Sequence, residues 1–328
     1  MNLAKIDLDV FEFDYDLTWA AFFLNQHGHV YARYGTRESR DADSMISKPG
    51  FMTVARKALE AHRRDKDRKP ARAAAAAPRT PESFRTLPDN LRSGKGCMHC
   101  HQVWDYERKD QGSYDKLQAL RVYPLAENLG FSFDVDAGNV VASVAPAGFA
   151  AKAGLKAGDE VVEANGTPVY SSADLSWVLH RMKDGETAAL KVKRAGSAST
   201  VSIRPTGDWR SRDIYWRGSM WAIQPTPGFG GKELDPAELA KAGLKPGSWA
   251  IKVRYIVTWG GESHEAGKSA VRAGLKVNDL VVGVAGKSDF DSELAFQAWY
   301  RLNQKAGSVV DLEILRDGKR MTLKLTVT

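Results

Sequence analysis

The chain has 328 residues, of which 43% are hydrophobic and 27% are charged, as is ordinary for a globular protein of two or three domains. No stretch approaches the roughly 18 consecutive apolar residues that a membrane span needs. The formal net charge is +7, but no nucleic-acid-binding motif with stacking aromatic residues accompanies it, so we do not expect nucleic acid as a partner.

The first 65 residues predict a β-hairpin followed by a helix. Residues 16–25 predict a buried strand, residues 26–28 a turn and residues 29–34 a second strand. A helix with one apolar face is expected from Gly50 to Arg64. This order resembles the C-terminal half of a thioredoxin-like domain, and a small α+β cap of other kinship is the alternative. The segment holds no Cys-x-x-Cys, so no thiol–disulfide exchange is expected of it.

The start of the chain carries acidic residues where a secretory signal peptide has basic and then apolar residues. Because a predicted strand follows so soon, we expect the N-terminus to be incomplete. Residues 66–80 are then rich in basic residues, alanine and proline, which is typical of an exposed linker. Its basic residues most simply face solvent, and contact with a membrane surface is the less favoured alternative.

Both cysteines of the chain lie in one unit, Cys97-Met98-His99-Cys100-His101, inside a connector that spans residues 81–126. Cys-x-x-Cys-His is the pattern that attaches a c-type haem, with two thioethers to the porphyrin and the histidine on the iron. Cys97, Cys100 and His101 are therefore predicted to bind haem c. Covalent haem attachment is a chemistry of extracytoplasmic compartments, so the motif favours a periplasmic or cell-envelope location.

The same residues suit other chemistry. Two thiolates and an imidazole, with His99 as a further donor, form a set that binds zinc or copper(I). A redox-active disulfide between Cys97 and Cys100 is a third interpretation. A four-ligand zinc finger is disfavoured, because no second Cys or His pair lies at finger spacing. Haem, metal and disulfide all remain open at this point.

A repeated motif organises the rest of the chain. The segment Ala-Gly-Leu-Lys-Ala-Gly-Asp-Glu-Val-Val at residues 153–162 recurs as Ala-Gly-Leu-Lys-Val-Asn-Asp-Leu-Val-Val at residues 273–282. An amphipathic helix is expected after each copy, followed by a strand that ends in a hairpin. The helices are expected at 174–182 and 292–302, and the strands at 189–196 and 311–318.

These motifs, with an asparagine-glycine turn and a strand ending in arginine-x-glycine, resemble the PDZ domain of the variety that follows bacterial high-temperature-requirement proteases. The resemblance implies a first PDZ-like domain at residues 127–208 and a second, insertion-bearing one at 212–328. The expected fold class is α+β multi-domain. A partial thioredoxin-like α/β segment (1–65), the linker and the connector precede two PDZ-like β-barrel or sandwich modules.

The resemblance also implies a binding site in the first copy. A PDZ domain accepts an extended peptide beside a strand edge and captures its C-terminal carboxylate with backbone amides of a short loop. The loop here would be residues 128–131, with Gly130 letting a ligand approach the backbone. The peptide-binding residues would be Leu129, Gly130, Phe131, Ser132, Phe133, Leu175, Val178, Leu179 and Met182. The alternative is that the apolar ones are simply core.

The second copy departs from this pattern. Its loop is expected at residues 220–223, with alanine in the glycine position, and an insertion is expected at 228–248. A structural or partner-docking role is therefore at least as plausible there, and Trp249 and Trp259 would suit an interface if they are exposed.

No Gly-x-Ser-Gly nucleophile turn and no segment long enough for a trypsin-like barrel are present, so we expect no proteolysis by this chain. The predicted function is a non-proteolytic envelope scaffold that docks protein partners or peptide C-termini and carries a redox-active haem c. The alternative is a PDZ adaptor with a structural zinc or copper site, or a redox disulfide, and no electron-transfer role.

Overall fold

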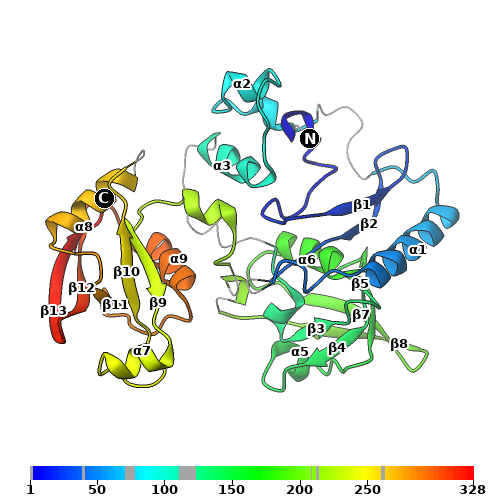
Figure 1. Cartoon of the computed structure of the whole chain (residues 1–328). Helices are drawn as coiled ribbons and strands as arrows, with labels where there is room; N and C mark the ends of the chain where they lie inside the picture. The colour runs from blue at the N-terminus through cyan, green and yellow to red at the C-terminus, as the bar shows by residue number, and fades with distance from the viewer. Residues whose placement is uncertain are drawn as a thin grey trace. The chain divides into compact units, whose positions relative to one another are not determined.

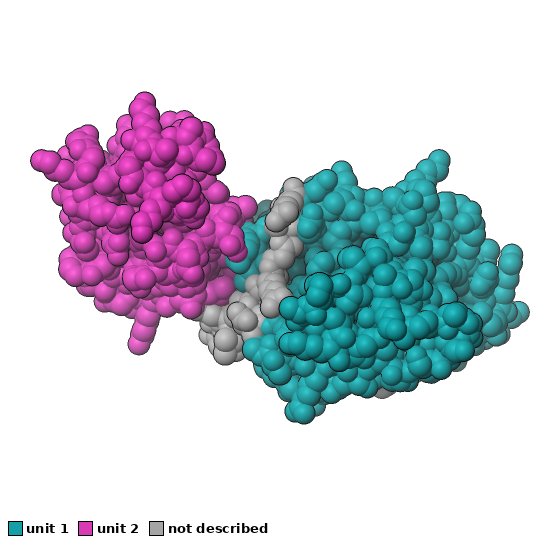
Figure 2. All heavy atoms as spheres, turned by 90° about the horizontal axis from the view of Figure 1, so that it is seen from below, with its two compact units in different colours: residues 1–219 teal, residues 220–328 magenta. Residues whose placement is uncertain are grey.

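The computed structural model describes residues 3–38, 41–70, 78–110, 123–207, 209–211, 214–259 and 263–328. The chain divides into two compact units, Met1–Ser219 and Met220–Thr328 (Figures 1 and 2). None of the described helices combines the length and the apolar character needed to cross a membrane. The alanine run 73–77 of the expected linker lies outside the described residues.

Unit 1 begins with the predicted hairpin and helix. Strands β1 (Ala21–Leu24) and β2 (Val30–Tyr34) pair antiparallel, and α1 (Lys48–Arg64) packs against them. Ser47 caps α1 by accepting a hydrogen bond from Gly50 N, which satisfies a free amide of the first turn. The predicted hairpin and helix are confirmed, although β1 begins five residues later than expected. The prediction that this strand is buried is wrong, because its residues are only partly buried and Leu24 is exposed. Kinship with a thioredoxin-like domain stays a prediction.

The connector builds a small core of its own. Its elements are η2 (Pro81–Ser83), α2 (Asp89–Arg92) and α3 (Cys100–Asp110), and η1 (Leu3–Lys5) joins them from the N-terminus. The buried apolar residues include Leu8, Tyr15, Leu87, Met98 and Val103. Met98, inside the Cys-x-x-Cys-His motif, is therefore a core residue, and the helix expected just after the motif is confirmed.

The first repeat copy forms two small sheets around one core. β3 (Phe131–Phe133) pairs with β4 (Val141–Val144), and a second sheet has the order β6-β5-β7-β8. Figure 1 shows α6 lying between these strands and the β1–β2 hairpin. The other elements are η3 (Ala126–Leu129), α5 (Phe149–Lys152), β5 (Glu160–Ala164), β6 (Thr167–Pro168), α6 (Ser172–Arg181), β7 (Ala188–Arg194), β8 (Ser197–Ile203) and η4 (Trp209–Ser211).

Unit 2 contains the second copy as one antiparallel sheet with the order β13-β12-β11-β10-β9. Helix α7, within the expected insertion, separates β9 from β10 and carries a capping box of Asp235 and Glu238. The bounds are η5 (Gly218–Ala222), β9 (Phe229–Glu233), α7 (Pro236–Lys241), β10 (Ile251–Ile256), α8 (Ser263–Arg272), β11 (Leu280–Val284), α9 (Glu293–Asn303), β12 (Val309–Arg316) and β13 (Lys319–Thr326).

Each copy contains the same ion pair between a buried aspartate and a partly exposed arginine. Arg194 donates to both carboxylate oxygens of Asp159 at 2.6 and 2.7 Å, and Arg316 donates to both oxygens of Asp279 at 2.7 Å. Each arginine also donates to the carbonyl of the motif's Ala-Gly glycine. The pair joins the aspartate of each repeat motif to the arginine before each hairpin turn, which explains why these residues recur together.

We expect Asp159→Ala to lower the free energy of unfolding of unit 1 by about 2 kcal/mol, because it removes two charge-assisted hydrogen bonds. Asp311→Ala is the matched control: its pair with Lys324 is about half exposed or more, at 48% and 70%, and should contribute less than about 1 kcal/mol to unit 2. Urea unfolding of each variant measures both losses. Equal losses would contradict a structural role for the shared pair.

Candidate functional site

Strand β3 presents one unpaired edge. It pairs with β4 on one side only, and that ladder uses the backbone groups of Gly130, Ser132 and Asp134. Because successive residues of a strand alternate, the backbone groups of Phe131 and Phe133 point to the opposite edge. In the part of the chain that the structure describes, no strand pairs with that edge. An extended peptide can add to such an edge through main-chain hydrogen bonds.

The loop before β3 requires its glycine for a reason within the domain itself, and the approach of a ligand to Gly130 stays a prediction. Gly130 has a φ of +90°, and a Cβ there would lie 2.7 Å from the Cα of Gly148. The close approach that requires glycine is thus made by the domain's own backbone. Asn128 fixes the other end of the loop by donating from its side-chain amide to the carbonyl of Trp209 at 2.8 Å.

Most of the side chains predicted to line the peptide groove are core residues. Seven of them belong to the hydrophobic core of the first copy: Leu129, Phe131, Phe133, Leu175, Val178, Leu179 and Met182. Ser132 is partly exposed, with its hydroxyl 2.7 Å from that of Ser143. Contact of these residues with a peptide stays a prediction. Sequence reasoning missed the opposite face of α6. The i, i+3, i+4, i+7 spacing along this helix could have indicated that face, which carries Ala173, Ser176, Trp177 and His180.

The N-terminal hairpin is clamped to the first turn of α6. Asp174 accepts a hydrogen bond from the backbone amide of Arg33 at 2.8 Å, and the Ser171 hydroxyl donates to the Arg33 carbonyl at 2.5 Å. Ser171 is also the N-cap of α6 and accepts from Asp174 N. Both backbone groups on the outer edge of β2 at this residue are therefore satisfied by the helix cap, and Asp174 is only 1% exposed.

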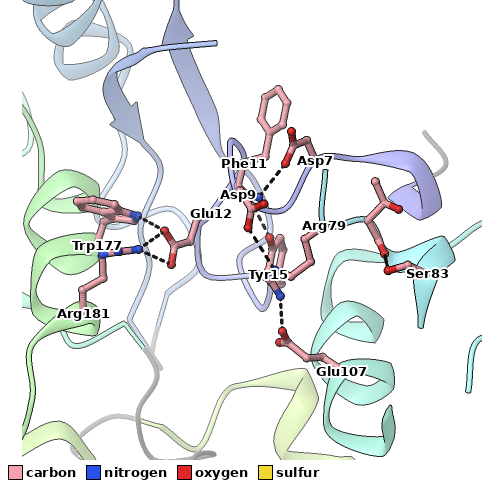
Figure 3. A network of polar contacts seen from close by, with 11 residues as sticks. Asp7, Asp9, Phe11, Glu12, Tyr15, Arg79, Ser83, Glu107, Trp177 and Arg181 are labelled. Atoms are coloured by element: carbon pink, nitrogen blue, oxygen red, sulfur yellow. Dashed lines mark hydrogen bonds and ion pairs between the residues drawn. The ribbon is translucent and has the colours of Figure 1, made fainter. Parts of the chain in front are cut away.

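Side chains reinforce this clamp. The Arg33 guanidinium lies over the Trp177 ring, 4.2 Å from its centroid. Figure 3 shows the Glu12 carboxylate accepting hydrogen bonds from Trp177 Nε1 at 2.9 Å and from Arg181 at 2.8 Å. Glu12 thus fixes the segment before β1 to the same helix.

A second contact network joins the N-terminal segment to the connector. Arg79 forms ion pairs with Asp9 and with Glu107 of α3 (Figure 3). The Tyr123 ring stacks on His180 of α6 with 4.1 Å between centroids, and Trp104 of α3 lies 6.3 Å from the same histidine. The hairpin, the helix that follows the cysteine motif and the PDZ-type helix α6 are therefore parts of one packed unit.

Two adjoining pockets lie beside α6 in unit 1. The space inside the first is about 390 Å³ and inside the second about 330 Å³, and both figures include volume open to solvent. Residues 34–36 and Ala173 line both, and the second pocket reaches Phe133 at the end of β3. The first is lined by Phe13, Asp14, Leu17, Ala20, Ala21, Phe22, Arg33, Tyr34, Gly35, Thr36, Arg37, Tyr123, Leu125, Ala173 and Ser176.

The cysteine motif lies at the start of α3. Cys97 is exposed, and Cys100 is partly buried, which raises the pKa of its thiol. The His101 side chain is 46% exposed, and its Nδ1 lies 3.8 Å from a carboxylate oxygen of Asp105 one turn later. The ring of His99 stacks beside that of His101 with 6.1 Å between centroids. Among the described residues, no three or more His, Cys, Asp or Glu side chains gather as a metal ion would require.

In the second copy, a helix side chain already binds the corresponding strand edge. Gln297 of α9 donates from its side-chain amide to the carbonyl of Phe229 in β9 at 2.9 Å. The expected loop at residues 220–223 is wrong: Gly228 accepts from Val257 N as Gly130 accepts from Ala145 N, so a glycine does stand before the strand. Residues 260–262 lie outside the described residues.

The two tryptophans that were expected to suit an interface differ in exposure. Trp249 is 7% exposed and packs in the core, whereas Trp259 is 62% exposed. Of these two tryptophans, Trp259 is the one available as a surface residue.

Residues 128–204 match the PDZ domain, so the chain contains a PDZ domain there. The chain as a whole is 31% identical over 154 residues to the periplasmic pH-dependent serine endoprotease DegQ of Escherichia coli strain K12. This match covers 47% of this chain and 30% of that protein. The chain is 39% identical over 185 residues to a probable periplasmic serine endoprotease DegP-like of Halomonas elongata, covering 56% and 36%. This chain thus spans about a third of the length of these relatives.

Among solved structures, the HtrA-type protease AlgW with decapeptide is similar over 42% of this chain and 41% of its own, with 19% identity and a TM-score of 0.25.

Burial raises the pKa of Asp174 to about 6, which predicts a specific pH dependence. Because the pKa in the folded state is above the ordinary value, the stabilising contribution of this carboxyl is fully present below about pH 4 and is lost as the pH rises through about 6, by about 3 kcal/mol. Asp174→Asn keeps an acceptor for Arg33 N but does not titrate.

We therefore expect wild type to lose more stability than Asp174→Asn between pH 4 and pH 7, as measured by urea unfolding. Asp67→Asn, at an exposed carboxyl of the same unit, serves as the control and should follow wild type. If the free energy of unfolding varied with pH in the same way for wild type and Asp174→Asn, the claim that the buried Asp174 carboxyl has a raised pKa would be contradicted.

Proposed function

We propose that the PDZ domain at residues 128–204 docks the C-terminal segment of a protein partner along the outer edge of β3. The observation that carries the proposal is the unpaired edge formed by Phe131 and Phe133, which ends beside the pockets under α6. The second copy supplies the contrast, since Gln297 already binds the carbonyl of its edge strand. In this proposal, the first copy of the module has an open groove that binds the partner, and the second copy has a structural role.

The proposed compartment is the periplasm or cell envelope. The relatives named above are periplasmic proteases, and haem attachment through a Cys-x-x-Cys-His motif belongs to the same compartment. The proposal assigns no proteolysis to this chain, because the sequence lacks the nucleophile turn of such proteases.

The donor set at the start of α3 fits a covalently attached haem, which is the second part of the proposal. Cys97 is accessible, Cys100 begins the helix, and His101 lies in its first turn with Nδ1 towards Asp105. A carboxylate beside Nδ1 orients an imidazole and leaves Nε2 for a metal. When bound, the haem would supply one-electron redox chemistry next to the docking domain.

The alternative is a PDZ adaptor in which Cys97, Cys100 and His101, with His99, hold zinc or copper, or in which the two thiols form a redox disulfide. The metal version would need these side chains to move together, because in the described residues they are not gathered around one point. We therefore favour haem, and elemental analysis for zinc and copper separates the two.

The docking proposal is tested with a peptide and its C-terminal amide. The tightest binder from a library of peptides with free C-termini is titrated into the full chain. It should shift the backbone amide resonances of Phe131 and Phe133, and leave those of Phe229 and Gly231 in place. The amidated form should bind at least about tenfold more weakly, because its C-terminus no longer offers a charged acceptor to the backbone amides of the loop. Equal affinity for both forms, or shifts confined to unit 2, would contradict the proposal.

The haem proposal is tested by exporting the chain in a host that matures c-type cytochromes. The intact mass should rise by one haem, and haem absorption should stay with the polypeptide after denaturation. Replacing Cys97 and Cys100 with serine should abolish both signals, whereas His99→Ala should retain them, since His99 has no role in this arrangement. A bare polypeptide mass in wild type would refute the haem.

A further inference from the structure

The first pocket beside α6 is built mostly from residues outside the PDZ domain. Only Ala173 and Ser176 of its lining lie within residues 128–204. The remaining wall comes from the segment before β1, the hairpin and residues 123–125. The space between these residues is about 390 Å³, a figure that includes volume open to solvent.

The wall is apolar and rich in rings. Phe13, Phe22, Tyr34 and Tyr123 line it, together with aliphatic side chains such as Leu17 and Leu125. Rings pack favourably edge to face or offset against other rings, so a flat aromatic group matches this surface better than a branched aliphatic one.

Each charged residue of the wall already has a partner. Asp14 forms a buried ion pair with Arg217, and the Arg33 backbone and guanidinium are held by Asp174 and Trp177. The Arg37 guanidinium lies 4.5 Å from the Trp216 ring centroid and donates to Thr18. The pocket is therefore suited to a neutral guest.

Unlike the charged residues, two hydroxyl groups of the described residues that line the pocket have no hydrogen-bond partner. Tyr123 and Ser176 are each 3% exposed, and within the described residues neither hydroxyl oxygen has a hydrogen-bond partner. Buried polar groups in proteins are nearly always hydrogen-bonded, and leaving one unsatisfied is costly. A guest with an apolar body and one hydrogen-bonding atom would satisfy what the fold leaves open.

We propose that this pocket binds the side chain of a tyrosine carried by the docked partner. The phenol ring would pack among the aromatic residues, and its hydroxyl would bond to Tyr123 or Ser176. The pocket adjoins the one that reaches Phe133 and shares residues 34–36 with it, so a peptide on the β3 edge lies beside it. The inference rests on the proposed docking function and adds a specificity site built by the N-terminal hairpin.

The test uses p-cresol, the side chain of tyrosine, and toluene, that of phenylalanine, titrated into the full chain. Methyl resonances of Leu17 and Leu125 report binding in the pocket, and those of Leu239 in unit 2 serve as an internal reference. The ratio of the two dissociation constants is the readout. p-Cresol should bind at least as tightly as toluene, although its hydroxyl must leave water.

Removing both hydroxyls, with Tyr123→Phe and Ser176→Ala together, should weaken p-cresol about fivefold relative to toluene, as the loss of one hydrogen bond implies. The matched control is Tyr255→Phe with Ser172→Ala, because Tyr255 lies in unit 2 and Ser172 lines only the second pocket. An unchanged ratio, equal losses in both double variants, or no shift at Leu17 and Leu125 would overturn the proposal.

The result of the p-cresol test can be distinguished from that of the peptide-docking test. If peptides shift the amides of Phe131 and Phe133 but p-cresol fails in the pocket, the tyrosine site alone is refuted. If p-cresol binds as expected and no peptide does, the docking proposal is refuted, and with it the peptide as the source of the tyrosine.

Discussion

The N-terminal cap of α6 joins the hairpin to the PDZ domain within unit 1. Ser171 and Asp174 perform the usual work of an N-terminal cap, and the same two side chains bind both backbone groups of Arg33 in the hairpin. A buried aspartate with a raised pKa is tolerable only because several donors surround it. Together with the contacts of Glu12 to Trp177 and Arg181, the cap fixes the hairpin and the segment before it against the PDZ domain.

The clamp gives this PDZ domain a wall that its own residues do not provide. Residues 34–36 follow the clamped Arg33 directly and pass between the two pockets beside α6. In unit 2, Gln297 of α9 instead donates to a carbonyl of the edge strand from within the same copy. The same module thus has an open edge with an added wall in one copy and a self-satisfied edge in the other.

Periodic and repeated features were predictable from the sequence. The hairpin, α1, α3, the paired helices and the strands after them were all expected, since each is set by local spacing of apolar residues. The clamp was not predictable, because Arg33 and Asp174 are far apart in sequence and neither belongs to a motif. The loop of the second copy was misplaced because its insertion falls after β9, a position that the spacing of the repeat does not reveal.

The backbone amide of Arg33 offers the most direct test of this account. It lies on the outer edge of β2 and bonds to Asp174 rather than to β1. Its exchange with deuterium, followed by NMR in the full chain, should be as slow as that of core amides in α6 such as Val178. Exchange at the rate of an unprotected amide would show that the hairpin is not held against the PDZ domain, and the composite groove would be contradicted.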